Sequence, residues 1–310
     1  MEILNEKKII EKIKNQPKRT KKYFCMYSSW LDGIVQDSQW MFVPIDDHIV
    51  HRGDGVFEAI RYCYGKFYDL ESHLRRLEKS RKAIGLECPK TNIEIEEILN
   101  QMIKLTSTDE AMVRLYLSRG PGGFTTNPYE SIGPQLYIVL TEYTHPKNEL
   151  YEKGAKACFI KEAIKPAPWH EIKSCNYLPN VMMKKYAVDH KIDFTVSISE
   201  DGKVAEGSTE NFAIILNNKF IAPPFDKTLE GTTLKKLVAL AKRQSQELGL
   251  SEICYADIYK EDVFSADEIF FIGTTLEVLP VTEFEGKPVG NGQVGPYAKK
   301  LRQILQDNMK

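Results

Sequence analysis

The sequence predicts a two-domain α/β fold, and three observations support this. Its 310 residues are enough for about two compact domains. Segments in which apolar residues alternate, as in strands, are mixed with segments of helical apolar spacing. A polar, proline-bearing stretch at 143–148 lies where the pattern of apolar residues changes between the two halves of the chain, and it indicates a linker. We therefore expect an N-terminal extension (1–22), a smaller domain (23–145) and a larger domain (146–310).

The composition argues against several classes of protein. Net charge is -1, from 42 basic and 43 acidic residues, so no general field would attract nucleic acid or an anionic membrane. No apolar run approaches the roughly 18 residues of a membrane span, and the charged N-terminus lacks the apolar segment of a secretory signal. The six cysteines show no paired spacing, which argues against a zinc site or disulfides and indicates a cytoplasmic location.

The N-terminal extension predicts a short amphipathic helix. Its apolar residues Ile3, Leu4, Ile9, Ile10 and Ile13 lie between many lysines, and a basic run follows at 18–22. We expect this helix to pack on its own domain, and a helix lying on a membrane surface is the alternative. We assign no chemistry to the segment.

The first domain is predicted to combine antiparallel strands with two helices. Strands are expected as a pair within 23–44, after the glycines of 53–55, at 111–117 and at 136–140. Helices are expected at 73–84, ended by Gly85, and at 93–105. The glycine-rich loop 118–124 is not predicted to hold a phosphate, because no clearly capped helix follows it.

The second domain repeats this mixture with more strands. Strands are expected at 156–160, 194–199, 211–216, 219–224 and 269–272, and helices at 182–190, 234–248 and 297–310. Gly231, Thr232 and Thr233 directly precede one of these helices. Free backbone N–H groups at a helix start suit a phosphate, although an ordinary helix cap would look the same.

Several short clusters carry the chemistry. The first is EIKSCNYLPNV at 171–181, and the second is VAEGSTENF at 204–212. HLRRL at 73–77 and GTTLEVLPV at 273–281 accompany them. From about residue 45 to 300, the clusters resemble, in this order along the chain, the class IV (fold-type IV) pyridoxal-phosphate enzymes. That family contains branched-chain aminotransferases, D-amino-acid aminotransferases and aminodeoxychorismate lyase.

The resemblance implies a fold, a cofactor and an assembly. The fold would be that of the fold-type IV enzymes, with a larger C-terminal α/β domain that resembles a β-barrel. Pyridoxal 5'-phosphate would lie in the cleft between the domains, and the protein would form a homodimer. Lys173 would be the catalytic residue that holds the cofactor as a Schiff base, which requires a desolvated amine. Glu206 would face the pyridine nitrogen, and Tyr177 would lie against the phenolic oxygen.

The resemblance also assigns residues to the cofactor phosphate and to the substrate. Arg76, rather than its neighbour Arg75, matches the phosphate-binding arginine. The remaining phosphate ligands would be Gly231, Thr232, Thr233, Thr274 and Thr275. Phe57, Arg114 and Thr275 would contact the substrate, with Arg114 binding the side-chain carboxylate of glutamate. Arg114 could equally be a paired strand residue. Glu277, in the last cluster, is expected to be structural.

The substrates implied are an amino acid and a 2-oxo acid, exchanged in a reversible two-stage transamination. FEAIR at 57–61 and Tyr177 resemble the branched-chain enzymes, so we predict transfer from a branched-chain L-amino acid to 2-oxoglutarate. Gly53-Asp54-Gly55 resembles the lyase and the D-amino-acid branches instead. Lyases usually carry threonine at the position of Glu58, and D-amino-acid enzymes an arginine near Phe124. A non-catalytic binding module on the same fold is the remaining alternative.

Overall fold

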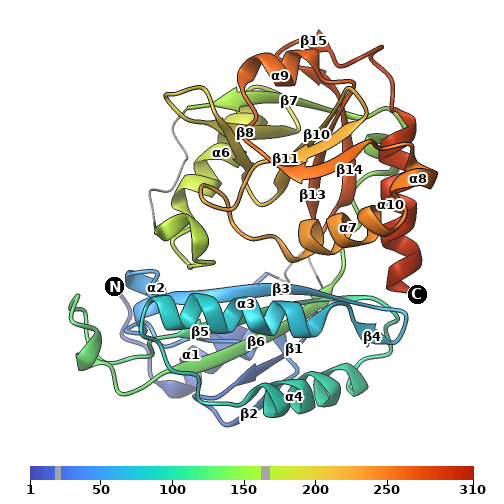
Figure 1. The fold of residues 1–310 in the computed structure, drawn as a ribbon. Helices are drawn as coiled ribbons and strands as arrows, with labels where there is room; N and C mark the ends of the chain where they lie inside the picture. The colour runs from blue at the N-terminus through green and yellow to red at the C-terminus, as the bar shows by residue number, and fades with distance from the viewer. Residues whose placement is uncertain (18–21, 162–167) are drawn as a thin grey trace.

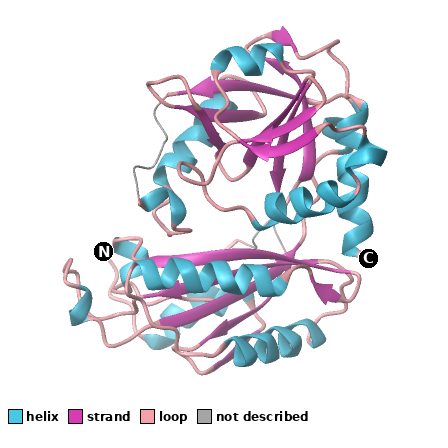
Figure 2. Cartoon of the chain, viewed as in Figure 1, coloured by secondary structure: helices cyan, strands magenta, loops and turns pink. Residues whose placement is uncertain are grey.

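The structure is a computed structural model that describes residues 1–17, 22–161 and 168–310. Its described strands form two sheets, one from each half of the chain (Figure 1). Each sheet is covered by helices of its own half, and the two layers face each other (Figure 2). The mixed α/β architecture with two domains is therefore as predicted. Most of the basic run at 18–22 lies outside the described residues.

The N-terminal sheet is antiparallel, with six strands in the order β2-β1-β6-β5-β3-β4 among the described residues. Its strands are β1 Tyr23–Ser28, β2 Gly33–Val35, β3 Gly55–Cys63, β4 Lys66–Phe67, β5 Ala111–Ser118 and β6 Gln135–Glu142. The strand pair predicted within 23–44 is β1 and β2, joined in antiparallel register from Ser28 and Gly33. The other strands predicted for this half are β3, β5 and β6.

Strands β3 and β5 present two chemically different faces. Val56 and Ile60 of β3, together with Val113 and Leu115 of β5, belong to the core under the helices. The alternate residues Phe57 and Ala59 pair with Tyr116 and Arg114 across the ladder. Because side chains alternate along a strand, this second set lies on the opposite face. That face is turned toward the C-terminal half.

The helices of the N-terminal half are α2 His48–His51, α3 Leu70–Ala83 and α4 Asn92–Lys104. Helix α3 packs on β3, and α4 packs on β1. Helix α4 begins with a capping box, in which Glu94 N donates to Thr91 Oγ1 and Thr91 N donates to a Glu94 carboxylate oxygen. Both longer helices agree with the predicted helical spacing, although α3 begins earlier than predicted.

The C-terminal sheet closes on itself. Its strands run in the order β12-β11-β10-β13-β14-β7-β8-β9, and β9 pairs back to β10 through Glu206 and Asn211. The sheet is therefore barrel-like, as predicted. Its strands are β7 Ala155–Ile160, β8 Phe194–Ile198, β9 Val204–Gly207, β10 Asn211–Leu216, β11 Lys219–Ala222, β12 Glu252–Tyr255, β13 Glu268–Gly273, β14 Glu277–Phe284 and β15 Lys287–Pro288.

The barrel wall separates two apolar cores. On strand β13, Ile269 and Phe271 belong to the core inside the barrel. Phe270 and Ile272 belong to the core between the barrel and two helices, α7 and α10. This strict alternation fixes the register of the strand, because a shift by one residue would exchange the two faces.

The helices of the C-terminal half are α5 Asn148–Glu152, α6 Leu178–Asp189, α7 Thr232–Arg243, α8 Ser245–Leu248, α9 Lys260–Ser265 and α10 Pro296–Met309. The single helix predicted at 234–248 is wrong, because α7 and α8 are separated at Gln244. The dihedral angles of that residue, φ -118° and ψ 22°, lie outside the helical region. Helix α6 begins earlier than predicted, with Pro179 in its first turn, where a missing N–H costs little.

The N-terminal extension contains the predicted helix, α1 Glu6–Lys14, but not the predicted packing. None of its residues is buried, and Ile9 remains 44% exposed. A hydrogen bond from Gln39 Nε2 to the Lys14 carbonyl connects its end to the first domain. In the described part of the chain, no helix is long and apolar enough to cross a membrane.

Candidate active site

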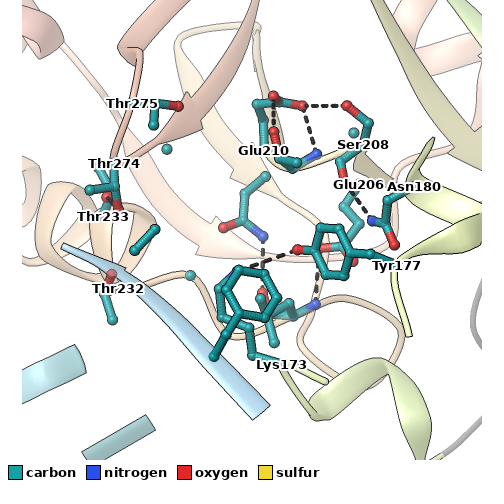
Figure 3. Close-up of a pocket in the computed structure, with 18 of the residues that line it drawn as sticks. Lys173, Tyr177, Asn180, Glu206, Ser208, Glu210, Thr232, Thr233, Thr274 and Thr275 are labelled. Atoms are coloured by element: carbon teal, nitrogen blue, oxygen red, sulfur yellow. Dashed lines mark hydrogen bonds between the residues drawn. The ribbon is translucent and has the colours of Figure 1, made fainter. Parts of the chain in front are cut away.

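Every residue predicted for the site lines one cavity of about 400 Å³ between the two sheets. The predicted residues are Phe57, Arg76, Arg114, Lys173, Tyr177, Glu206, Gly231, Thr232, Thr233, Thr274 and Thr275. Figure 3 shows the lysine, tyrosine and glutamate on one side and the four threonines on the other. The fold thus brings together clusters that lie far apart in the sequence.

Lys173 is attached to the first sheet by its backbone. Its carbonyl accepts a hydrogen bond from Phe57 N at 2.9 Å, and its own N–H donates to Ser80 Oγ at 3.2 Å. The side chain is only 9% exposed. Lys173 Nζ lies 4.6 Å from the centre of the Phe57 ring and 3.4 Å from the Tyr177 hydroxyl. The amine is therefore held in a largely desolvated, aromatic environment.

Tyr177 and Glu206 approach the same region from α6 and β9. Burial raises the pKa of the Tyr177 phenol, with the nearby Glu206 carboxylate acting in the same direction. A Glu206 carboxylate oxygen accepts from Leu229 N at 3.0 Å. Asn180 of α6 donates to the Ser208 carbonyl at 2.5 Å, which connects the lysine segment to the turn after Glu206 (Figure 3). The two residues are thus fixed relative to each other.

Helix α7 points its N-terminus into the cavity. Its N-cap residue, Gly231, has no side chain to occupy the first N–H groups. A Cβ on Gly231 would lie 1.7 Å from Asn211 Oδ1, so a larger residue would displace the Asn211 side chain, which donates to the Leu229 carbonyl. Thr233 Oγ1 lies 3.3 Å from Thr274 Oγ1, which joins this helix start to the 273–276 turn. Hydroxyls and backbone N–H groups at a helix start form an anion site.

Arg76 borders this anion site and is held firmly. Its Nε and one terminal nitrogen donate to the two Glu58 oxygens at 2.8 and 2.7 Å. The other terminal nitrogen donates to the Glu230 carbonyl at 3.0 Å. These bonds use three of the five guanidinium N–H groups, so an anion can still be bound. Arg75, in contrast, is 69% exposed beside Glu71, as expected.

Glu58 is a residue whose role the sequence did not reveal. It is fully buried, and besides Arg76 it contacts His73 Nδ1 at 2.7 Å. His73 Nε2 in turn lies 3.3 Å from Thr232 Oγ1. Burial alone would raise the pKa of Glu58, but the charge and hydrogen bonds of Arg76 and His73 lower it to about 2. Glu58 therefore orients groups on both sides of the anion site.

A sequence signal for Glu58 did exist. Along β3 it shares a face with Val56 and Ile60, and both of these residues are in the core. A carboxylate on the apolar face of an alternating strand needs a buried cation as partner. Arg76, in the following helix α3, is that cation.

Glu277 is structural, as predicted. Its oxygens accept from Arg61 at 2.6 Å and from Arg302 at 2.7 Å, and these cations lower its pKa although burial alone would raise it. Its backbone has φ 60°, an uncommon value for a side chain larger than glycine. Tyr143 donates to the Thr275 carbonyl at 2.8 Å. Together these contacts fix the turn that carries Thr274 and Thr275.

The opposite end of the cavity is a wall of β3 and β5 side chains. Phe57 stacks on Tyr116 with ring centres 5.9 Å apart, and Ala59 and Ile172 add apolar surface. Arg114 also lines this wall and is partly buried. Within the described residues its side chain makes no hydrogen bond or ion pair, whereas its backbone pairs with β3 and β6. The lining residues include none from the glycine-rich loop 118–124.

The chain belongs to a known family of enzymes. The family model described as "Amino-transferase class IV" matches residues 55–284, which include the whole cavity wall. The protein is therefore a class IV aminotransferase, and enzymes of this class use pyridoxal 5'-phosphate. This agrees with the lysine, carboxylate and anion site found in one cavity.

The named relatives are aminotransferases of two substrate types. The chain is 33% identical over 290 residues to the chloroplastic D-amino-acid transaminase of Arabidopsis thaliana, covering 93% of this chain and 77% of the relative. It is 30% identical over 286 residues to a putative branched-chain-amino-acid aminotransferase of Methanocaldococcus jannaschii, covering 90% and 95%. Among solved structures it is similar to a T.th. branched-chain amino acid aminotransferase complexed with N-(5'-phosphopyridoxyl)-L-glutamate, with TM-score 0.84, 27% identity and coverage of 93% and 94%.

Proposed function

We propose that this enzyme moves the amino group of a branched-chain L-amino acid to 2-oxoglutarate. The observation that carries the proposal is Arg114, a cation without an internal partner among the described residues, in a wall otherwise made of Phe57, Tyr116 and Ala59. One pocket must accept an apolar side chain in one half-reaction and a side-chain carboxylate in the other. An apolar wall with one reachable guanidinium meets both needs.

The residues of the cavity fit the cofactor. A buried amine, a carboxylate and an anion site at a helix start converge in a space of about 400 Å³. We assign Lys173 to the covalent attachment and Glu206 to the ring nitrogen. We assign binding of the cofactor phosphate to Arg76, Gly231, Thr232, Thr233, Thr274 and Thr275. When bound, pyridoxal phosphate serves as an electron sink for the carbanion formed at the substrate α carbon.

Proton transfer is the task of Lys173. Its Nζ removes the proton from the α carbon of the donor, and in the second half-reaction it protonates the α carbon of the new amino acid. The neighbouring Tyr177 has a raised pKa, so its hydroxyl stays protonated at neutral pH and can donate a hydrogen bond. The turn at Thr275 offers backbone N–H groups for the substrate α-carboxylate. Phe57 covers the amine on the side of the first sheet.

A D-amino acid is the second candidate for the amino donor. The relatives at 33% and 30% identity include a D-amino-acid transaminase of Arabidopsis thaliana and a D-alanine aminotransferase of Bacillus licheniformis. Gly53-Asp54-Gly55 agrees with that branch. Phe124, where D-specific enzymes usually carry an arginine, argues against it. The same glycines resemble the lyase branch, whereas Glu58, where lyases usually carry threonine, argues against pyruvate elimination.

The choice between donors can be made with one set of assays. The purified enzyme is given L-leucine, L-isoleucine, L-valine, D-alanine or D-aspartate with 2-oxoglutarate, and glutamate formation is followed with enantiomer-specific detection. We expect turnover with the branched-chain L-amino acids and formation of L-glutamate. Turnover confined to the D-amino acids would assign the enzyme to the second candidate.

We also propose that the enzyme is a homodimer. Large apolar side chains are exposed in two neighbouring segments, with Ile45 73%, Val50 49% and Phe124 65% exposed. The segments touch where the His51 ring packs 5.1 Å from the Phe124 ring. An exposed apolar patch of this kind marks an interface. Light scattering should give twice the mass of one chain for the wild type, and a monomer for Ile45→Asp combined with Phe124→Asp.

A further inference from the structure

A second cavity lies outside the active site, between α3 and α7. It has a volume of about 520 Å³ and is lined by residues of both helices. Six of its lining residues are cations, Arg75, Arg76, Lys79, Lys235, Lys236 and Arg243, whereas Asp69 and Glu230 are its only acidic lining residues within the described ranges. Figure 1 shows the two helices facing each other where the halves of the molecule meet. The groove therefore has a strong positive potential.

The groove has a buried charged floor. Arg76 is only 9% exposed and lies in the wall shared by this groove and the active site. Its contacts with Glu58 and Glu230 fix the guanidinium plane. A fixed, desolvated guanidinium binds an anion more strongly than a flexible surface lysine does. Because Arg76 is also assigned to the cofactor phosphate, a second anion in the groove would be bound mainly by the cations around it.

The lysines of the groove form ion pairs within the protein. Lys236 pairs with Asp69 at 2.9 Å, and Lys79 pairs with Glu171 at 3.0 Å and with Glu230 at 3.4 Å. Lys235 also pairs with Glu230. Lys79 and Lys235 are about half exposed. Ion pairs of exposed side chains contribute little to stability, so an anion of higher charge can replace them. Arg243 has no ion pair with any residue in the described ranges. The groove is thus lined by one cation without an ion pair in the described ranges, Arg243, and by lysines whose pairs are partly exposed.

The spacing of the cations indicates an elongated ligand. Lys235 and Arg243 are eight residues apart on α7, which corresponds to about 12 Å along the helix axis. A single phosphate cannot contact both ends, but linked phosphates can. We propose that the groove binds an anion with two or more linked phosphate groups, free or as part of a nucleotide. This site adjoins the one assigned to the cofactor, because Arg76 and Thr232 line both cavities, and it does not depend on which amino acid is the donor.

Calorimetric titration of the holoenzyme tests the proposal, because the cofactor then fills the active-site anion position. We expect one molecule of pyrophosphate to bind per chain, at least about tenfold more tightly than inorganic phosphate. Arg243→Ala or Lys236→Ala should weaken pyrophosphate binding about fivefold or more. Lys242→Ala, a neighbouring exposed cation on α7 outside the groove, should change it less than about twofold.

Comparison with ADP identifies the source of the phosphates. Tighter binding of ADP than of pyrophosphate indicates a nucleotide, whereas equal affinity indicates the linked phosphates alone, and both results support the site. The proposal is overturned if pyrophosphate does not bind the wild type or binds no better than inorganic phosphate. It is also overturned if Lys242→Ala weakens binding as much as Arg243→Ala does. Circular dichroism of each variant checks that the fold is intact.

Discussion

The two ends of the active-site cavity differ in how completely their polar groups are paired within the protein. At the end assigned to the cofactor phosphate, Arg76 makes three hydrogen bonds to Glu58 and Glu230. His73 extends this network to Thr232. At the other end, the Arg114 side chain makes no hydrogen bond within the described residues, and its neighbours on the wall are aromatic or apolar.

This difference indicates that one end of the cavity determines affinity for the cofactor and the other determines selectivity among substrates. A guanidinium that is already oriented loses little entropy when it binds an anion, so the paired end suits a group that stays bound through many turnovers. A partly buried cation without an internal partner gains most when the ligand supplies the carboxylate. Changes at the first end should therefore affect stability and cofactor binding, and changes at the second end should affect the choice of substrate.

Replacing Lys173 should have the largest effect on activity. Lys173→Ala removes both the attachment point and the base, so turnover should fall by about four orders of magnitude or more. Lys185→Ala, an exposed lysine paired with Asp189 on α6, is the matched control and should remain active. After borohydride reduction, peptide mass spectrometry should place the cofactor on Lys173. A label on Lys184, Lys185 or Lys165 (the last outside the described residues) would contradict the assignment.

Glu206→Gln should slow proton transfer while the cofactor stays bound. The phosphate contacts are untouched, but a neutral amide no longer keeps the ring nitrogen protonated, so kcat should fall about 100-fold or more. Single-turnover absorbance changes would measure this step, and cofactor content would be determined on the same sample. Near-normal turnover would shift the role to Glu210, which also lines the cavity.

Replacing Glu58 should lower the free energy of unfolding, because Glu58 holds Arg76 at the phosphate end of the cavity. Glu58→Gln leaves the buried Arg76 without its counter-charge, and breaking a buried pair in this way costs about 3–5 kcal/mol. Urea denaturation of wild type and variant would measure the loss, with Glu71→Gln, beside exposed Arg75, as the control. A loss below about 1 kcal/mol would show that the network does not hold Arg76.

The same carboxylate predicts a dependence on pH. The pKa of Glu58 is lowered to about 2 in the folded protein, below its ordinary 4.5, so the folded state favours the ionised form. The stabilisation is complete above about pH 4.5 and is lost as the pH falls toward 2. The Tm difference between wild type and Glu58→Gln should therefore shrink as the pH falls below 4.5. An unchanged difference at pH 3 would contradict this account.

Residues in short contiguous clusters could be predicted from the sequence. Lys173, Glu206 and the Gly231-Thr232-Thr233 segment lie in short contiguous clusters, so the resemblance to the class IV enzymes could be seen in the sequence and implied a shared site. The alternating pattern of β3 and β5 also predicted the strands that form its wall.

The contacts between distant segments could not be predicted in this way. The Glu58–His73–Thr232 network joins β3, α3 and α7, and its value depends on burial that only the packed fold creates. The break between α7 and α8 at Gln244 could not be predicted, because no proline or glycine lies at that position. The sequence did not decide whether Arg114 binds the substrate or is paired within the sheet, because pairing in a strand depends on neighbours from other segments.

The central claim is that the two ends of the cavity have separate tasks, and comparing Arg76→Ala with Arg114→Ala tests it most directly. For each variant, cofactor affinity and the ratio of kcat/KM for 2-oxoglutarate to that for an apolar 2-oxo acid are measured. Arg76→Ala should weaken cofactor binding about tenfold or more and leave the ratio unchanged, whereas Arg75→Ala should change neither. Arg114→Ala should lower the ratio about tenfold and leave cofactor affinity unchanged. An Arg114→Ala enzyme with the wild-type ratio, or with cofactor affinity reduced as far as in Arg76→Ala, would contradict the account.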